Sequence, residues 1–267
     1  MTEPAPWVSL DEATTMLHTG TGRGVRVAVI DSGIEVTHPR LAGVTLADDV
    51  SIVSDGLRLS TQPNAGRDDY GHGTAVAGII HEVAPDAELG SFHTLDAQLD
   101  ARSAAIREAV RQALDKGYHI INCSFGCGVL DQVLDYKEWV DEAYLKGVHI
   151  VAACSNRDCG TPEWPAYFSS VITVNMARTP ESGQFWYRHG EMVEFAARGV
   201  DVDVAWCGGR TKTVTGSSFA APRVAGMLAR MLSVRPDLTP TQVKALLHRL
   251  AAPWSLEIRG PNVRFST

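Results

Sequence analysis

The sequence lacks the features that mark membrane, secreted and nucleic-acid-binding proteins. No stretch approaches the roughly 18 consecutive apolar residues of a membrane-spanning helix. The N-terminus, MTEPAPWVSLDEATTML, has neither a basic segment nor the apolar core of a signal peptide. No cluster of Lys and Arg occurs, and the formal net charge is −7. We therefore expect a cytoplasmic protein with no nucleic acid or membrane partner, and its oligomeric state stays open.

Cysteine is also scarce, and the five residues of this type are Cys123, Cys127, Cys154, Cys159 and Cys207. An odd number in a chain without an export signal favours mostly reduced thiols. The two closest spacings are C-x3-C and C-x4-C, and they miss the C-x2-C pairs of most zinc sites. We expect no metal and no cofactor. A local disulfide stays open, because a sequence cannot assign the pairing.

The 267 residues show no break in composition, which predicts one domain over 1–267. Near-continuous apolar runs at 24–31, 117–124, 147–155 and 170–175 are typical of parallel strands buried on both faces. Helical patterns at 101–116, 131–146 and 240–250 alternate with them. The order predicts an α/β fold of three layers, with a mainly parallel central sheet flanked by helices.

Finer expectations concern single elements. The first helical pattern places Ile106, Val110 and Leu114 inward, and the second places Leu134, Trp139 and Tyr144 inward less cleanly. Thr239 is a plausible N-cap of the last helix. The interior segment 54–69 reads as a loop, and the tail after Pro253 reads as a surface strand or coil.

Polar residues end several of the strand patterns, namely Asp31, Ser124, Ser155 and Asn156. Open parallel sheets bind ligands at this edge, so these positions are candidates for a site. An Asp that only caps the following Ser-Gly turn is the alternative for Asp31. His72 lies between two glycines, which indicates that another group approaches its backbone closely. The nearby pair Asp68-Asp69 reads as a solvated loop.

The segment GSSFAAP, residues 216–222, contains two serines before a helical pattern. Such a pair is usually an N-cap, but the helix dipole would also favour a nucleophile at Ser218. The G-x-S-x-G elbow of other hydrolases is absent, because Ala220 stands where the second Gly would be. The chain order Asp31, His72, Ser218 instead fits a different acid, base and nucleophile arrangement.

Three segments carry a family resemblance: AVIDSGI, YGHGTAVAGII and TGSSFAAPRVAG. They resemble the signature segments of subtilisin-like serine proteases, in the order of that family. The resemblance extends from about residue 25 to about residue 250. It implies a subtilisin-like fold with a catalytic triad of Asp31, His72 and Ser218, and Ser217 in the position of the family's threonine.

Two further segments resemble the family's binding strands. HIVAACSNRDCG is similar to the strand that ends in the oxyanion asparagine, which implies this role for Asn156. INCSFGCG is similar to the substrate-binding strand. By the resemblance, Ser124, Phe125 and Gly126 form one wall of the S1 pocket, which holds the substrate side chain before the cleaved bond (P1). Residues 152–156, with Ala153 and Ser155 among them, form the opposite wall.

Several departures from the family also matter. Many secreted relatives carry a calcium-binding loop inserted in the helix after the catalytic His. The corresponding segment here, IIHEVAPDAEL, has no such insertion, so we expect no strong calcium site there. Residues 1–24 resemble the start of a mature catalytic domain, so we expect neither signal peptide nor propeptide, a catalytic core over 25–250 and a tail over 251–267. By the resemblance, Cys127 and Cys159 lie on the two loops beside S1, where a disulfide between them would link the two loops. Arg157 would favour acidic groups near P1, unless Asp158 cancels its charge.

These observations predict a serine endopeptidase that cleaves a peptide or protein substrate through an acyl-enzyme. Processing of a specific peptide or precursor is one form of this activity. Two alternatives stay open. One is an inactive or gated peptide-binding relative, and the other is an esterase or transpeptidase that uses the same site.

Overall fold

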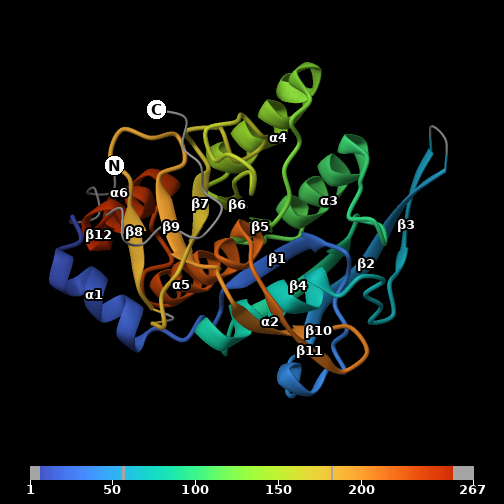
Figure 1. Ribbon diagram of the computed structural model, residues 1–267, viewed down its shortest axis with the longest axis horizontal. Helices are drawn as coiled ribbons and strands as arrows, with labels where there is room; N and C mark the ends of the chain where they lie inside the picture. The colour runs from blue at the N-terminus through green and yellow to red at the C-terminus, as the bar shows by residue number, and fades with distance from the viewer. Residues whose placement is uncertain (1–6, 56–57, 182, 255–267) are drawn as a thin grey trace.

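The structure is a computed structural model that describes residues 7–55, 58–181 and 183–254. Its centre is a ten-stranded sheet (Figure 1). In sheet order the strands are β12 (Ala252–Pro253), β8 (Phe185–Tyr187), β9 (Phe195–Arg198), β7 (Ile172–Ala177), β6 (His149–Ala153), β5 (Ile120–Cys123), β1 (Arg26–Asp31), β4 (Glu88–His93), β2 (Leu46–Asp55) and β3 (Arg58–Pro63). The prediction for the tail after Pro253 falls mostly on residues outside the described ranges.

Most neighbouring strands run parallel, and only the β2/β3 and β8/β9 pairs of this sheet are antiparallel. The predicted α/β class and mainly parallel sheet are confirmed. The prediction of a loop over 54–69 is wrong in part, because β2 and β3 form a hairpin there. β3 has the sequence RLSTQP and is exposed along its whole length. A polar edge strand of this kind has no apolar pattern to reveal it.

Helices cover both faces of the sheet and make the outer layers. α1 (Leu10–Thr19), α2 (His72–Val83), α5 (Ala221–Val234) and α6 (Pro240–Leu250) share one core cluster. α3 (Ser103–Asp115) and α4 (Val133–Leu145) share the other. β1 shows why its sequence reads as a continuous apolar run: Val27 and Val29 belong to the first cluster, and Ala28 and Ile30 belong to the second.

The helices follow their predicted patterns with one exception. Ile106, Val110 and Leu114 of α3 are buried as expected. In α4, Trp139 is buried, but the inward placement of Leu134 and Tyr144 is wrong because both are exposed. The buried face of α4 consists of Tyr136, Trp139, Val140 and Ala143. These four positions are spaced three or four residues apart, as one helix face requires.

The start of α6 confirms the predicted N-cap. The Thr239 hydroxyl accepts a hydrogen bond from the backbone N–H of Gln242, and the Gln242 side chain accepts one from the backbone N–H of Thr239. This capping box satisfies two amide groups that the helix leaves without partners. Pro240 fits at the first helical position because its missing N–H costs nothing there.

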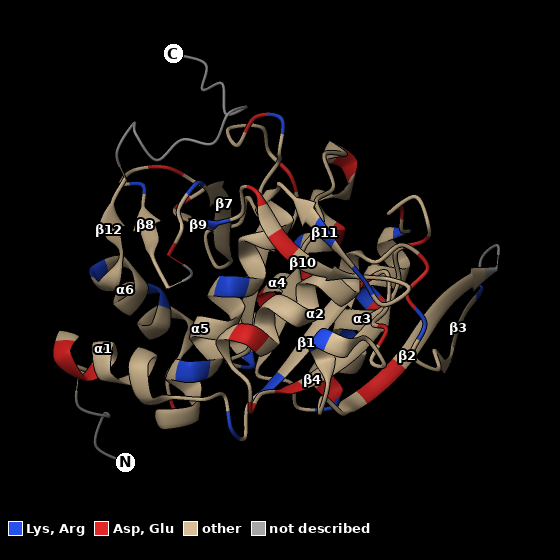
Figure 2. Ribbon diagram, turned by 60° about the horizontal axis from the view of Figure 1, so that its bottom comes forward, with Lys and Arg blue, Asp and Glu red and all other residues tan. Residues whose placement is uncertain are grey.

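A two-stranded ribbon, β10 (Val202–Trp206) and β11 (Arg210–Val214), packs over α2. Basic and acidic positions are interspersed along the ribbon (Figure 2). Ion pairs join Arg111 to Asp115 within α3 and Lys137 to Asp141 within α4. Within the described ranges, none of the helices combines the length and the apolar character needed to cross a membrane.

Candidate active site

The sheet brings the predicted site residues to one edge. Asp31 ends β1, Ser124 follows β5, and Asn156 lies just beyond β6. These three strands are neighbours in the order β6-β5-β1, and they run parallel. Their carboxyl ends therefore meet, as expected for a ligand site in an open parallel sheet.

His72 begins α2 and pairs with Asp31. The distances from His72 Nδ1 are 2.8 Å to Asp31 Oδ1 and 3.0 Å to Asp31 Oδ2. Both side chains are buried. The backbone N–H of Ser32 also donates to Asp31 Oδ1 at 2.8 Å. Both oxygens of the Asp31 carboxylate thus contact His72 Nδ1, and they hold the imidazole ring with Nε2 directed away from Asp31.

The glycines beside His72 are needed for close packing, as the sequence indicated. A Cβ atom at Gly73 would lie 2.0 Å from the carbonyl oxygen of Gly33. Gly71 has φ 109°, and a Cβ atom there would lie 2.7 Å from Trp206 Nε1. No residue with a side chain fits either position without displacing backbone. The first turn of α2 is thereby pressed against the end of β1, where Asp31 lies.

The prediction that Asp68 belongs to a solvated loop is wrong. Its Oδ1 accepts hydrogen bonds from Ser32 Oγ at 2.8 Å and from the backbone N–H groups of Tyr70 at 3.1 Å and Gly71 at 2.7 Å. Its Oδ2 accepts from the backbone N–H of Thr74 at 2.8 Å and from Thr74 Oγ1 at 2.6 Å. Asp68 therefore caps the start of α2 in place of an N-cap side chain, which Gly71 does not have.

Sequence reasoning missed this role because the cap precedes the helix by four residues. Ser32 was missed as well. Its hydroxyl accepts from the backbone N–H of Gly73 at 3.0 Å while it donates to Asp68. The sequence offers two signals: a short polar residue, Ser32, directly after a strand, and an acidic residue, Asp68, shortly before the Gly-His pair. Neither signal shows that the residue caps the start of α2.

The pKa of His72 is raised above its usual value of 6.5. Burial by itself lowers this pKa, because it disfavours the charged imidazolium. The charge and hydrogen bond of Asp31, together with the charge of Asp68, outweigh burial. The site is therefore arranged to stabilise a proton on His72.

The two serines of GSSFAAP have different surroundings. Both lie in a short 3-10 turn, η3 (Ser217–Phe219), directly before α5. Ser217 is fully buried and Ser218 is half-buried. The ring of Phe219 packs against His72, with 5.3 Å between the ring centroids. The helix start therefore presents Ser218, and not Ser217, on the accessible side of the turn.

Ser218 Oγ donates a hydrogen bond to the backbone carbonyl of Ser124 at 3.1 Å. Ser124 Oγ in turn donates to the backbone carbonyl of Ser218 at 3.0 Å. Among the described residues, Ser218 Oγ has no hydrogen bond to His72. The Asp31–His72 half of the predicted triad is thus hydrogen-bonded. The His72–Ser218 half is not, and catalytic hydrogen bonds are often long or poorly aligned before a substrate binds.

Asn156 is held by Ser217. Its Oδ1 accepts from the backbone N–H of Ser217 at 2.8 Å and from Ser217 Oγ at 2.9 Å. Ser217 Oγ also lies 2.6 Å from the carbonyl oxygen of Cys154. Because two donors use Oδ1, the Asn156 amide has one stable orientation, and its Nδ2 group is left to donate elsewhere. Asn156 itself is exposed.

The residues predicted to wall the S1 pocket come from the loop after β5 and from the end of β6 with the loop that follows it. Ser124, Ala153 and Ser155 are buried, Phe125 is half-buried and Gly126 is exposed. The Ser155 hydroxyl accepts from the backbone N–H of Arg157 at 3.4 Å.

The suggested disulfide between Cys127 and Cys159 is wrong, because all five thiols are free. The backbone of Cys127 instead pairs with that of Trp164. The thiol of Cys159 turns inward into a cluster with Cys154 and Val193, and it lies 3.3 Å from Arg188 Nη1. Over the residues that the structure describes, no group of three His, Cys, Asp or Glu side chains is arranged to hold a metal ion.

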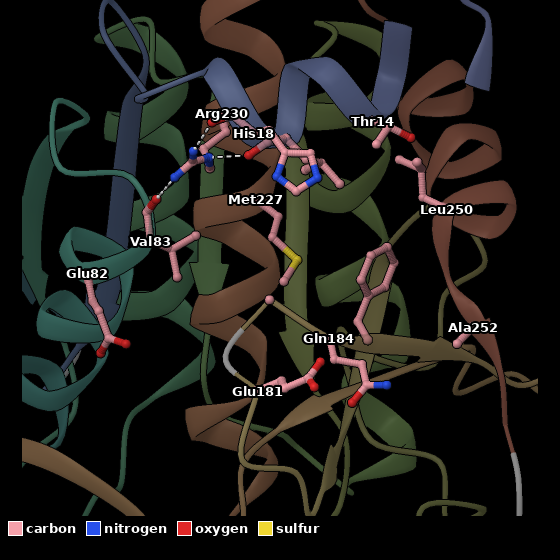
Figure 3. Close-up of a pocket in the computed structure, with 13 residues that line it drawn as sticks. Thr14, His18, Glu82, Val83, Glu181, Gln184, Met227, Arg230, Leu250 and Ala252 are labelled. Carbon is pink, nitrogen blue, oxygen red and sulfur yellow. Dashed lines mark hydrogen bonds between the residues drawn. The ribbon is translucent and has the colours of Figure 1, made fainter. Parts of the chain in front are cut away.

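A hollow of about 620 Å³ lies between α1, α5 and the segment before β8 (Figure 3). Arg230 crosses one end of it and donates to the carbonyl oxygens of Leu17, His18 and Val83. These bonds tie the ends of α1 and α2 to α5 and engage all three nitrogens of the guanidinium. The predicted triad contributes nothing to the described lining, so we do not regard this hollow as the active site.

Comparisons with known proteins agree with the geometry. The model of the Subtilase family matches residues 22–263. The chain is 31% identical over 241 residues to a thermostable alkaline protease of Halalkalibacterium halodurans, with 86% of this chain and 63% of that protein covered. It is 29% identical over 260 residues to Subtilisin Savinase of Lederbergia lenta, with 93% and 92% covered.

Solved structures are similar as well. A cold-adapted subtilisin-like serine proteinase superposes with a TM-score of 0.71 at 27% identity, covering 86% of this chain and 83% of that one. The S41 psychrophilic protease gives a TM-score of 0.73 at 25% identity, covering 89% and 88%. The chain spans 63% of the length of the H. halodurans protease and 66% of the M-protease of Shouchella clausii.

Proposed function

Because the chain belongs to the subtilase family, we propose that it is a serine endopeptidase that cleaves peptide bonds through an acyl-enzyme on Ser218. The observation that carries the proposal is the buried hydrogen bond of 2.8 Å between His72 Nδ1 and Asp31 Oδ1, formed beside the turn that presents Ser218. The names of the relatives, which include proteases and subtilisins, support the same reaction.

In the proposed reaction His72 acts as general base and then as general acid. As Ser218 Oγ bonds to the substrate carbonyl carbon, His72 Nε2 takes the hydroxyl proton. The C–N bond then breaks, and His72 returns the proton to the leaving amine. Water attacks the acyl-enzyme with His72 again as base, which releases the acid and restores the serine. Asp31 fixes the tautomer and stabilises the imidazolium throughout.

Asn156 is the proposed oxyanion donor. The bonds from Ser217 to its Oδ1 leave its Nδ2 group free to donate to the oxygen of the tetrahedral intermediate. The backbone N–H of Ser218 would be the second donor, at the start of α5, where the helix dipole favours negative charge. A donor fixed in advance needs no reorientation in the transition state, which is why it lowers the barrier.

The substrate would bind as an extended strand beside Ser124, Phe125 and Gly126. The backbone after β5 pairs with a peptide by strand addition, and the P1 side chain enters between this segment and the segment of Ala153 and Ser155. The carbonyl of Ser124 now accepts from Ser218 Oγ. Binding of a substrate that brings the carbonyl carbon to Ser218 would replace this contact.

The test is intact-mass spectrometry after exposure to a fluorophosphonate, which reacts only with activated serines. We expect one adduct on the wild type and none on Ser218→Ala. Ser217→Ala is the matched control at the adjacent serine. It should still form an adduct, but more slowly, because Asn156 loses the contact with the Ser217 hydroxyl and keeps only the one with the backbone N–H. A folded wild type that gives no adduct would favour the inactive or gated peptide-binding alternative.

An adduct followed by preferential turnover of esters, or by transfer to an added amine, would favour the esterase or transpeptidase alternative. Processing of one specific precursor, the cytoplasmic location, the absence of nucleic acid and membrane partners, and the single-domain division over 1–267 stay predictions. Cell fractionation and cleavage profiling of a peptide library would test the first two.

A further inference from the structure

Glu163 lies on the segment that pairs with the backbone just beyond one of the two proposed S1 walls. The backbones of Cys127 and Trp164 form an antiparallel bridge, with N–H to O distances of 2.9 and 2.8 Å. This bridge holds residue 163 beside residue 126. A Cβ atom added at Gly126 would lie 2.4 Å from Glu163 Oε2 and 3.2 Å from Glu163 Cδ. The carboxylate therefore occupies the space next to the Gly126 backbone that any larger residue would fill.

The same carboxylate is also close to the opposite wall. Burial raises the pKa of the Cys154 thiol, and the nearby charge of Glu163 raises it further. Cys154 directly follows β6 and precedes Ser155. Glu163 thus lies within electrostatic reach of both segments that are proposed to bracket the P1 side chain.

The charge of Glu163 has no counter-ion in the part of the chain that the structure describes. Its side chain is half-buried, and no described residue donates a hydrogen bond to it or forms an ion pair with it. Arg188, a buried cation whose charge acts on the same Cys154 thiol, is engaged elsewhere: it donates to Cys159 Sγ and to the Val193 carbonyl, and its Nη2 lies 3.7 Å from Glu191. A half-buried carboxylate without a partner favours a cationic ligand.

We propose that Glu163 makes the S1 pocket selective for a basic P1 residue, arginine above lysine; this deepens, and rests on, the proposed peptidase function. The apolar stem of arginine would lie between Phe125 and Ala153, and its planar guanidinium would meet the carboxylate with two parallel hydrogen bonds. Lysine offers only a point charge, so it should rank second.

A competing charge stands on the rim of the pocket. Arg157 follows Asn156 and is exposed, and the sequence suggested that it would favour acidic groups near P1. Its charge is screened by water and offset by the neighbouring Asp158. Glu163 is half-buried beside Gly126, where a charge acts more strongly. The two residues predict opposite P1 preferences, so one series of substrates decides between them.

The experiment uses peptide substrates that differ only at P1, with arginine, lysine, citrulline, phenylalanine or glutamate. Citrulline has the shape of arginine without its charge. We expect kcat/KM for arginine to exceed that for citrulline by roughly 10- to 100-fold, the range of one charge-assisted hydrogen-bonded contact. In Glu163→Gln the arginine-to-citrulline ratio should fall toward one, and in Glu163→Lys glutamate should become the better substrate.

Glu181→Gln is the matched control, because Glu181 is an exposed glutamate in the separate hollow of Figure 3. It should keep the wild-type ratio. Active-site titration with the fluorophosphonate normalises every variant for its content of folded, reactive enzyme. Equal turnover of arginine and citrulline by a labelled wild type would overturn the proposal. A preference for glutamate, or an unchanged ratio in Glu163→Gln, would overturn it as well.

A second readout separates this proposal from the peptidase mechanism. In a Ser218→Ala background, fluorescence anisotropy measures the affinity for the arginine and citrulline peptides without cleavage. Tighter binding of the arginine peptide, lost in the double variant with Glu163→Gln, supports the pocket even if the wild type forms no adduct. Equal affinities for the two peptides refute it whatever the activity.

Discussion

Replacement of Asp68 by alanine tests whether one carboxylate positions the catalytic helix. Asp68 accepts five hydrogen bonds at the start of α2. Its removal leaves the N–H groups of Tyr70, Gly71 and Thr74 without their acceptor. It also breaks the link through the Ser32 hydroxyl. Because His72 is the first residue of α2, the substitution should loosen the Asp31–His72 pair as well as the fold.

The expected loss of stability follows from these contacts. A hydrogen bond to a charged group contributes about 1.5–3 kcal/mol, and removal of a helix cap costs about 0.5–2 kcal/mol. Water can reach part of this site because Asp68 is only half-buried, so the five bonds do not add in full. We expect the free energy of unfolding to fall by about 2–4 kcal/mol in Asp68→Ala.

The assay is equilibrium unfolding in urea, followed by circular dichroism. All variants carry Ser218→Ala, which prevents self-digestion during the measurement. The shift of the midpoint at constant slope gives the change in free energy. Asp69→Ala is the matched control at the adjacent residue. Asp69 is exposed, and its ion pair with Arg67 spans 3.1 Å at the surface, so its loss should cost less than about 0.5 kcal/mol.

The reasoning is refuted if Asp68→Ala and Asp69→Ala lower the stability equally, or if Asp68→Ala costs less than about 0.5 kcal/mol. A large loss of stability in Asp69→Ala would also contradict the assignment of the cap. The Asp68→Asn variant, with Ser218 intact, separates charge from shape. Because the charge of Asp68 raises the pKa of His72, this variant should shift the acid limb of the activity profile to lower pH.

Three further predictions concern the chemistry and the packing of the site. His72 must be neutral to act as a base. Because its pKa is raised, it stays protonated at pH values above the usual 6.5. The acid limb of the pH profile of kcat/KM should therefore have its midpoint above pH 6.5. In Asp31→Asn this midpoint should fall and kcat should drop roughly 10⁴-fold, a magnitude taken from triad loss in subtilisin itself; an unmoved midpoint would contradict the assignment. Asn156→Ala should lower kcat by about 10²–10³ with little change in KM, again a magnitude from subtilisin; a change confined to KM would show that Asn156 only binds substrate. Gly73→Ala should fail to fold or lose the Asp31–His72 contact, because its Cβ would lie 2.0 Å from the Gly33 carbonyl oxygen; a stable variant with full activity would refute this.

The sequence by itself specified the parallel sheet and the residues at its carboxyl edge. Strands buried on both faces need apolar residues at successive positions, and β1 shows this in Val27, Ala28, Val29 and Ile30. Asp31, Ser124 and Asn156 were found because each is the polar residue that interrupts such a run. The small residues around His72 and Ser218 made both positions candidates, and the resemblance to subtilisin-like proteases assigned the nucleophile to Ser218 over Ser217.

Only the tertiary structure decided how these residues are supported. In the sequence, Asp68 is one of two acidic residues in a loop. Its role depends on a helix that starts four positions later and on Ser32, which directly follows β1. The β2–β3 hairpin was hidden because an exposed edge strand buries nothing and shows no apolar period. The unpaired state of Cys127 and Cys159 was hidden because it depends on which way two loops turn their side chains.

The charged residues near the proposed S1 pocket also show what the sequence reveals and what only the structure reveals. A sequence places Arg157 beside Asn156 and leaves Glu163 as one more glutamate in a loop. The antiparallel bridge between Cys127 and Trp164 brings Glu163 to Gly126, a neighbour that lies 37 positions away in the chain. Local patterns fix which residues can do chemistry, because burial and helix ends impose them. Which charges face the substrate depends on long-range backbone contacts, and these exist only in the folded chain.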